Sequence, residues 1–528
     1  MATIAIRGRR ALDIPIVLIG LSLVVAAAML LPVAYLIIRV TGSGALWDEL
    51  TAPATREALA RTVVLAAAVT AASIAISVPL AWLTVRTDLP LRRTWTVLFA
   101  LPLAIPSYVG AFTLVSALGP SGIVQGWLEP MGVERLPEIY GFFGAWLALT
   151  LFTFPYVYLP SRAALRSVDR SMEEAARGLG ASRMTTFMRV TLPQLRPAVA
   201  AGALLVALYT LSDFGAVSLL RFDSLTRVIY VRYTSSFDRS SAAALALILV
   251  ALAFVVVWIE SATRGRARYD TTARHNPPPA VALGAWRWPA IAFCAAVVLA
   301  SLALPVSVIA YWLVRGLQAG EAVEFVREAG MNSLYASGMA AAVAVAAATP
   351  VAILAVRYPG LLSSAIEKVA YSGFALPGIS VALALVFFAA NYVPSLYQTL
   401  ALLVFAYCVR FLPEALGSIR AALLRVHPDT ERAAHGLGRG RPYVFWRITL
   451  PQMAPGMSAG AMLVFITAMK ELPATLLLSP IGFDTLATEI WSSTREAFYT
   501  RAALPALVLV ALSAFPVAFS TLREERRA

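Results

Sequence analysis

Charged residues are scarce in this 528-residue chain, at 14% of the total against a hydrophobic share of 59%. A soluble protein of this length carries about 25% charged residues, so the deficit argues against a large water-soluble core and indicates an integral membrane protein. The net charge of +14 falls in short segments between apolar runs, as membrane topology requires. That placement argues against nucleic acid as a partner.

Cysteine, histidine and lysine are also rare. The two cysteines, Cys294 and Cys408, both lie inside apolar runs, which is typical of small packing residues rather than a disulfide or metal site. The three histidines lack metal-ligand spacing. Neither lysine, Lys368 or Lys470, lies in a Gly-x-x-x-x-Gly-Lys-Ser/Thr loop, so the chain lacks this phosphate-binding motif of ATPases. Catalytic groups do not cluster, which disfavours a membrane enzyme.

Long apolar runs, by contrast, fill the chain, and about twelve reach the ~20 residues that cross a bilayer. They are continuous rather than alternating, so the predicted fold class is an all-α membrane protein and not a β-barrel. The first run is too long for a cleaved signal peptide and predicts a retained span. The runs lie near 12–38, 60–85, 95–118, 140–160, 198–220, 241–260, 288–314, 334–356, 368–390, 396–416, 458–478 and 502–521.

Basic residues predict the orientation of these spans. With the N-terminus inside, the cytoplasmic segments collect most arginines, among them Arg86 and the C-terminal Arg523, Arg526 and Arg527. The outer loop at 221–240, which carries four arginines, fits less well. Both termini are therefore expected in the cytoplasm. Each half has about six spans, an even number, so the two halves should have the same orientation.

A polar segment occurs twice, and this duplication divides the chain. Residues 173–180 read Glu-Glu-Ala-Ala-Arg-Gly-Leu-Gly, and 258 residues later 431–438 read Glu-Arg-Ala-Ala-His-Gly-Leu-Gly. Each copy is followed by Thr-Leu-Pro-Gln, and the Leu-Pro pair with the proline after it is expected to end the polar unit before the next span. The predicted organisation is a first half at 1–260 with its loop at 161–197, a cytoplasmic linker at 261–287, and a second half at 288–528 with its loop at 417–457.

Each loop is predicted to form a helix–turn–helix on the inner membrane surface. Glu173 and Arg177 form a favourable i,i+4 pair, Gly180 supplies a left-handed stop, and Ser182 can cap a second short helix. In the second copy Pro442 takes a first-turn position instead. One such loop could simply pack under its own helices. Two matched copies favour a pseudo-symmetric cytoplasmic partner.

The sequence Glu-Ala-Ala-x-x-Leu-Gly followed by Leu-Pro-x-x-x-Pro resembles the EAA loop of binding-protein-dependent ABC importer permeases, over essentially the whole chain. The resemblance implies two fused six-helix permease halves in a bacterial inner membrane, and loops that insert into ATP-binding subunits. It also implies two copies of that ATPase, a periplasmic solute-binding protein, and ATP and Mg²⁺ on the ATPase, with no cofactor or metal on this chain. Arg432, where Glu174 stands in the first copy, makes the second contact unequal. The residues expected to dock are Glu173, Glu174, Ala175, Ala176, Gly180, Phe187, Glu431, Ala433, Ala434, Gly438 and Phe445.

Several segments point to a solute class. Ser-Asp-Phe-Gly-Ala at 212–216, Leu-Ala-Ile-Pro-Ser-Tyr at 103–108 and Lys-Glu-Leu-Pro-Ala-Thr-Leu-Leu at 470–477 resemble iron(III) importer permeases. Fused thiamine permeases have the same architecture, and polyamine, phosphonate and sulfate permeases are more distant alternatives. A twelve-span secondary transporter is a further alternative, but it would need no docking loop in each half.

Asp213 and Glu471 occupy matching positions inside apolar runs. A charge at a helix centre costs about 2.5–3.5 kcal/mol on insertion scales, so it usually faces a cavity or a partner. One hypothesis places both carboxylates on the path between the halves, near Tyr209, where oxygen ligands would suit ferric iron. The alternative is that both acids lie near the outer ends of their helices and bond to backbone or to loop arginines.

Overall fold

The structure, a computed structural model, describes residues 15–41, 44–120, 122–133, 135–168, 170–235, 238–263, 281–321 and 324–527. The N-terminal arginines before residue 15 and most of the expected linker, at 264–280, lie outside the described residues, as do the side chains of Arg523, Arg526 and Arg527. Within the described part, regular structure is helical, and β pairing is limited to an isolated bridge between Thr87 and Val281. The all-α prediction is confirmed.

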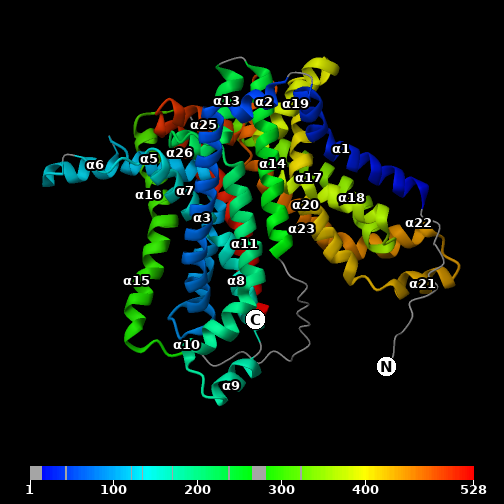
Figure 1. Cartoon of the computed structure of the whole chain (residues 1–528), viewed down its shortest axis with the longest axis horizontal. Helices are drawn as coiled ribbons and strands as arrows, with labels where there is room; N and C mark the ends of the chain where they lie inside the picture. The colour runs from blue at the N-terminus through cyan, green and yellow to red at the C-terminus, as the bar shows by residue number, and fades with distance from the viewer. Residues whose placement is uncertain are drawn as a thin grey trace. The chain divides into compact units, whose positions relative to one another are not determined.

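The chain separates into two compact units, whose helices are labelled in Figure 1. One unit, here called the α17–α24 unit, contains Met1–Gly42 and Met331–Thr485. Its helices are α1 (Ile16–Thr41), α17 (Glu324–Arg357), α18 (Leu361–Tyr371), α19 (Gly378–Tyr392), α20 (Leu400–Arg425), α21 (Pro428–Gly436), α22 (Arg441–Val444), α23 (Leu450–Met469) and α24 (Pro473–Leu478).

The other unit, the α2–α16 unit, contains Ser43–Gly330 and Leu486–Ala528. Its first ten helices in chain order are α2 (Ala45–Thr51), α3 (Pro53–Arg86), α4 (Arg92–Ala100), α5 (Ser107–Leu118), α6 (Ile123–Leu128), α7 (Phe142–Thr153), α8 (Pro155–Ser167), α9 (Arg170–Gly178), α10 (Arg183–Thr186) and α11 (Leu192–Ser212). The remainder are α12 (Gly215–Leu219), α13 (Leu225–Thr234), α14 (Arg239–Thr263), α15 (Arg287–Val298), α16 (Leu304–Gln318), α25 (Leu486–Arg495) and α26 (Tyr499–Arg527).

The compact units are composed differently from the two halves of the sequence, because terminal helices cross over. Helix α1 packs against α18 and α19 of the second half, where the Tyr35 hydroxyl donates to the Phe387 carbonyl at 3.2 Å. Helices α16 and α26 pack together and against first-half elements, with the Phe112 and Tyr499 rings 5.5 Å apart. Each unit therefore draws on both halves of the chain.

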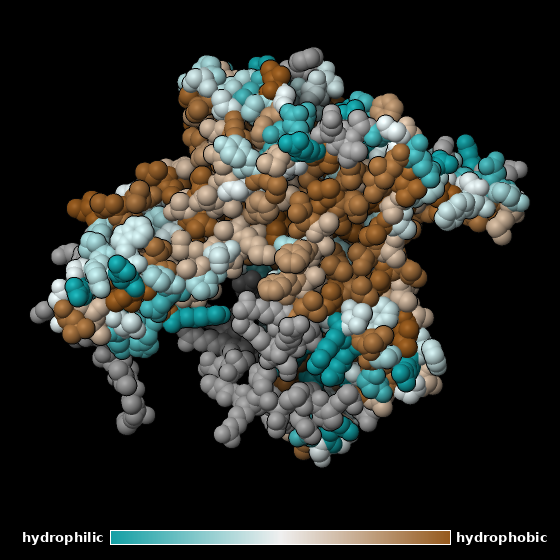
Figure 2. All heavy atoms as spheres, turned by 180° about the vertical axis from the view of Figure 1, so that it is seen from behind, coloured by the Kyte–Doolittle hydropathy of each residue, from teal (hydrophilic) through white to brown (hydrophobic). Residues whose placement is uncertain are grey.

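Eleven helical segments in the described residues are long and apolar enough to cross a membrane, or twelve if the bent pair Leu361–Ala375 and Gly378–Tyr392 counts as one span. This agrees with the predicted number of spans. Apolar side chains are widely exposed, as the broad brown areas of Figure 2 show, and they include Val24 at 67% and Ile38 at 63% on α1. Such a surface suits contact with lipid rather than water.

Two predicted spans, 198–220 and 458–478, extend past the ends of their helices. Helix α11 ends at Ser212 and α23 at Met469, and the apolar residues that follow form the short helices α12 and α24. Hydropathy cannot detect this change because both elements are apolar. The expected run at 95–118 is also interrupted, since a 3₁₀ turn at Leu101–Ala104 and Pro106 separate α4 from α5.

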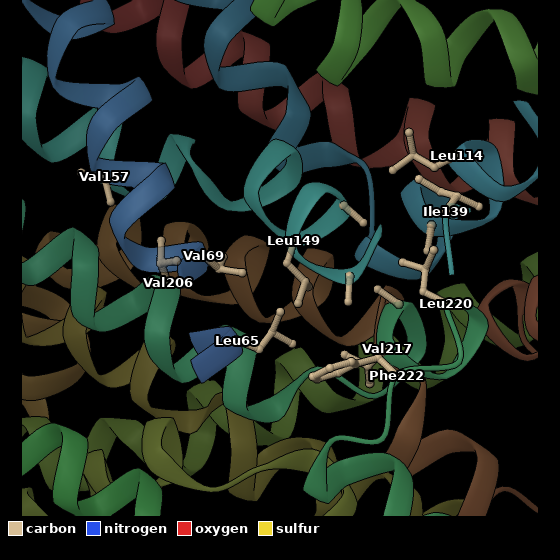
Figure 3. Close-up of a cluster of buried hydrophobic side chains, with 14 residues drawn as sticks. Leu65, Val69, Leu114, Ile139, Leu149, Val157, Val206, Val217, Leu220 and Phe222 are labelled. Atoms are coloured by element: carbon tan, nitrogen blue, oxygen red, sulfur yellow. The ribbon is translucent and has the colours of Figure 1, made fainter. Parts of the chain in front are cut away.

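The short helix α12 is held in the main core of the α2–α16 unit. Val217 and Leu220 are fully buried there against Leu65 of α3, Leu114 of α5 and Leu149 of α7 (Figure 3). Within a membrane, close van der Waals packing of such side chains drives the association of helices. This packing fixes the position where α11 ends and where Asp213 begins the next element.

Candidate functional site

The turn between the two helices of the first loop is built as the sequence predicts. Helix α9 is followed by Gly180 at φ +88°, a left-handed conformation that glycine adopts without strain. The Ser182 hydroxyl accepts the Thr185 amide at 3.2 Å and so caps α10. The chain then passes through a π-helical turn at Phe187–Thr191 directly into α11. The Leu-Pro pair does not end the unit, because Pro193 stands in the first turn of α11, where its missing N–H costs nothing.

The second loop repeats this construction. Helix α21 is followed by Gly438 at φ +79°, and Pro442 stands in the first turn of α22, as expected. A π-helical turn at Phe445–Thr449 again leads straight into α23. The two copies therefore share a backbone plan as well as a sequence.

The glutamate that the two loops share, Glu173 or Glu431, faces its own protein chain. The Glu173 carboxylate accepts hydrogen bonds from Arg86 at 3.0 Å and from Thr191 at 2.7 Å. The expected contact with Arg177 is therefore replaced by one with the last residue of α3. In the second loop, Arg357 and Thr449 each donate to Glu431 at 2.9 Å.

The exposed surface of each loop is formed mostly by residues other than this glutamate. Glu174 and Ala175 are exposed, and so is Ala433, whereas Ala434 is only 7% exposed. Ala176 is half-buried. Arg432, which replaces Glu174, forms an ion pair with Asp429 at 2.7 Å on the loop surface. The two copies therefore differ in surface charge, as the sequence predicts.

The expected aromatic positions, Phe187 and Phe445, are both half-buried. The Phe187 ring lies edge-on to Trp82 of α3, with 6.3 Å between centroids. The Phe445 ring lies edge-on to its neighbour Trp446 at 5.5 Å. The Phe187 ring therefore helps to hold its loop against α3, and both rings are partly accessible.

Sequence reasoning misses two pairs of exposed apolar side chains. Leu179 and Leu437, which are 90% and 82% exposed, sit at the same position in the two loops. Met188 and Trp446, which are 52% and 65% exposed, form a second matching pair. The sequence signal that could have identified them is a large apolar residue at the same position in both copies of a polar loop. A shallow depression beside Leu179 is lined by Glu174, Arg177, Gly178, Gly180, Ala181 and Ser182.

Asp213 caps the short helix α12. One carboxylate oxygen accepts the amides of Ala216 at 3.0 Å and Val217 at 3.2 Å, and the other accepts the Ser107 hydroxyl. The side chain is 7% exposed. These contacts match the alternative in which the acid bonds to backbone, because its acceptor oxygens are already in use.

Glu471 has the same role before α24. Its carboxylate accepts the Ala474 amide at 3.2 Å and a charged hydrogen bond from Arg410 of α20. A Cβ atom at Gly378 would lie 2.7 Å from side-chain atoms of both Arg410 and Glu471, so this glycine leaves room for their ion pair beside α19. Tyr209, the third expected pathway residue, is partly exposed, with its ring 5.9 Å from that of Tyr156.

Another intramembrane acid, Glu414 of α20, is absent from the sequence-based candidates. It is partly exposed, accepts the Thr467 hydroxyl at 3.0 Å and interacts electrostatically with Lys470. The matching positions in the first half hold Tyr156 and Ser212. The described residues contain no group of three or more His, Cys, Asp or Glu side chains that could hold a metal ion.

Apolar helices of membrane-crossing length, duplicated with one matched polar loop per copy, define a two-repeat membrane transport subunit. The chain belongs to the family described as "Binding-protein-dependent transport system inner membrane component", which matches residues 73–269 and again 345–527. It is thus a multi-pass inner-membrane permease subunit of an ABC importer, and a transport subunit rather than an enzyme.

Individual relatives agree with this assignment. The chain is 35% identical to the Fe(3+)-transport system permease protein FbpB 2 of Haemophilus influenzae, over 96% of this chain and 97% of the relative. It is 33% identical to the molybdenum transport system permease protein ModB of Mycobacterium bovis, over 40% of this chain and 80% of the relative. The sulfate transport system permease protein CysT of Escherichia coli is 28% identical, over 48% and 94%.

Proposed function

We propose that this permease carries iron(III) across the inner membrane. The observation that carries the proposal is the 35% identity with an iron(III) permease over 96% of the chain, across both halves and their loops. The molybdenum and sulfate relatives align with less than half of the chain. The segments at 103–108, 212–216 and 470–477, which resemble iron(III) permeases, support the same solute.

The energy for transport comes, in this proposal, from two separate ATP-binding subunits, which also hold ATP and Mg²⁺. The chain lacks the phosphate-binding loop of an ATPase, and it has two loops of one construction, each suited to one ATPase copy. A periplasmic binding protein delivers the solute. The arginine distribution supports cytoplasmic termini and cytoplasmic loops.

Docking would use the exposed face of each loop. Leu179 and Leu437 are candidates for anchors, since burial of a largely exposed leucine in a partner's cleft removes its apolar surface from water. Glu174, Ala175 and Ala433 surround them. The exposed ion pair of Arg432 with Asp429 gives the second loop a surface charge that differs from that of the first loop, which has Glu174 at the matching position.

The experiment that tests the solute is reconstitution of the permease with its ATPase and binding protein in proteoliposomes. We expect ATPase stimulation and uptake with iron(III), and neither with molybdate, sulfate, thiamine or a polyamine. Stimulation of the ATPase by one of the other solutes would show that this solute, and not iron(III), is transported. Uptake that needs no ATP and follows an ion gradient would instead indicate a secondary transporter.

The orientation can be tested by labelling single cysteines in intact cells. Both native cysteines are buried, so cysteines introduced for Leu179 and Leu437 should give clean signals. They should react with a membrane-impermeant maleimide only after the cells are opened. Trp127→Cys, in the expected outer loop and 69% exposed, should react in intact cells. The reverse pattern would invert the topology.

A further inference from the structure

The glutamate that the two loops share, Glu173 or Glu431, makes the same three-residue contact in each half of the chain. Its carboxylate is held by an arginine that ends a 34-residue helix, α3 or α17, and by the threonine that ends the π-helical turn. We refer to this contact as the carboxylate latch. Its members are Arg86, Glu173 and Thr191 in the first half and Arg357, Glu431 and Thr449 in the second half.

The latch is kept although the two halves differ in the spacing between its members. Glu173 and Glu431 lie 258 residues apart, whereas Arg86 and Arg357 lie 271 residues apart. The segment between arginine and acid is therefore longer in the first half, yet the pair meets at 3.0 Å in one case and 2.9 Å in the other. A chance surface contact would not be expected in both halves when the segment between its partners differs in length.

The environment of the latch makes it stronger than an ordinary surface ion pair. The arginine side chains are 6% and 16% exposed, and the glutamates 21% and 20%. Charged hydrogen bonds that are shielded from water are stronger than exposed ones, and loss of one partner leaves the other charge uncompensated. The carboxylates are therefore engaged within the chain and are poorly placed to reach a partner.

We propose that Arg86 and Arg357 are positioning residues for energy coupling, and that Glu173 and Glu431 act through them rather than by docking to the ATPase. This inference rests on the proposed function. The latch joins α9 to the end of α3, and α21 to the end of α17, so each loop helix moves with a long membrane-crossing helix as one body. Movement of the docked ATPase is thereby transmitted to the span, while neighbouring residues such as Leu179 make the contact.

A spin-label experiment without ATPase tests the geometry of the latch. Labels at Leu179→Cys and Leu91→Cys, both exposed positions, report the distance between the first loop and the end of α3. Leu437→Cys and Leu361→Cys do the same in the second half. We expect a narrow distance distribution in the parent protein, a broad one with Arg86→Gln or Arg357→Gln, and recovery when Arg86→Glu is combined with Glu173→Arg. Arg177→Gln, an exposed arginine of the same loop, is the matched control. An unchanged distribution in the latch variants would overturn the proposal.

Reconstitution tests the consequence for coupling. The Arg86→Gln and Arg357→Gln variants should still co-purify with the ATPase, while solute uptake per ATP falls at least about five-fold, the lower range of allosteric coupling. If Glu173→Gln and Glu431→Gln lose the ATPase while the arginine variants keep it, the carboxylates are docking contacts and the latch has no coupling role. If the parent protein binds no ATPase, the proposed function fails, and the spin-label result still decides whether the latch exists.

Discussion

Acidic residues at matching positions serve two different structural purposes in this permease. Glu173 and Glu431 hold a loop to the end of a long helix, whereas Asp213 and Glu471 cap short helices inside the apolar core. In all four cases the carboxylate accepts hydrogen bonds from donors of the same chain. A carboxylate conspicuous in the sequence therefore need not be the one that meets a solute or a partner.

The exposed leucines of the loops should dominate ATPase binding. Leu179→Asp and Leu437→Asp place a charge where an apolar contact is expected, so we expect each to weaken association by about 2 kcal/mol or more, the scale of an interface hot spot. Co-purification with the ATPase is the measurement. Leu91→Asp, 74% exposed and outside the loop, should leave binding unchanged. Equal loss in all three variants would point to general destabilisation.

The two capping acids should differ in their tolerance to neutralisation. Asp213→Asn keeps an acceptor for the cap, so the loss of stability should be about 1 kcal/mol or less. Glu471→Gln leaves Arg410, only 15% exposed, without its anion, which costs about 3–5 kcal/mol. Thermal unfolding and membrane abundance would measure both effects, and adding Arg410→Gln to Glu471→Gln should restore stability.

Transport by the same variants decides between the two hypotheses for these acids. We expect Asp213→Asn and the Arg410→Gln/Glu471→Gln double variant to take up solute when membrane abundance is normal. Loss of uptake at normal abundance would support the hypothesis that these carboxylates line the transport pathway. Glu414 and Lys470, which are partly exposed, would then be tested in the same assay.

At the scale of elements, the left-handed glycine sets the direction in which each loop helix leaves the turn. Gly180→Ala and Gly438→Ala force a side chain into positive φ, at a cost of about 1–2 kcal/mol. We expect weaker ATPase association or coupling in both. Gly178→Ala and Gly436→Ala are matched controls, because these glycines are helical and a Cβ there meets nothing within 4 Å. If Gly180→Ala and Gly438→Ala behave like their controls, the docking model is wrong.

Breaks between elements are the other feature at this scale. The helix ends at Ser212 and Met469 fall inside apolar runs, and each break is stabilised by a cap from a single acid. The bend of 106° before α19 follows a 3₁₀ turn and Pro377. Short helices can therefore lie within the apolar region while their backbone polar groups remain satisfied.

At the scale of the whole molecule, the exchange of terminal helices makes each half of the chain depend on the other. Residues 1–260 and 288–528 expressed as separate chains should co-purify, because α1 packs on α18 and α19 while α16 and α26 pack on first-half elements. Affinity capture of one tagged half measures this. Independent purification of both halves as stable proteins would contradict it.

The N-terminal helix should be the sensitive part of this arrangement. Deletion of residues 1–42 removes Tyr35, whose hydroxyl bonds Phe387, and Arg39, which lies over the Phe387 ring at 5.3 Å. We expect faster proteolysis within residues 331–485. The milder Tyr35→Phe variant loses the bond donated to the Phe387 carbonyl and the bond accepted from Asn391. It should lower the free energy of unfolding by about 1–2 kcal/mol.

The sequence by itself determined the class of fold, the number of spans, the duplication and the turn chemistry of the loops. Each of these depends on local pattern: apolar length, a constant offset between copies, and a glycine where φ must be positive. The location of the two repeated loops followed from the same signals. The structure shows positive φ at Gly180 and Gly438, and it confirms the Ser182 cap through the hydrogen bond from the Thr185 amide to the Ser182 hydroxyl.

Only the tertiary structure decided which side chains are available. Arg86 and Glu173 are 87 residues apart, and Arg357 and Glu431 are 74 apart, so no local pattern could pair them. The same holds for Asp213, whose partner Ser107 comes from another helix. Charge identifies a residue that needs a partner, but only the packing of helices distant in sequence decides whether that partner belongs to the same chain.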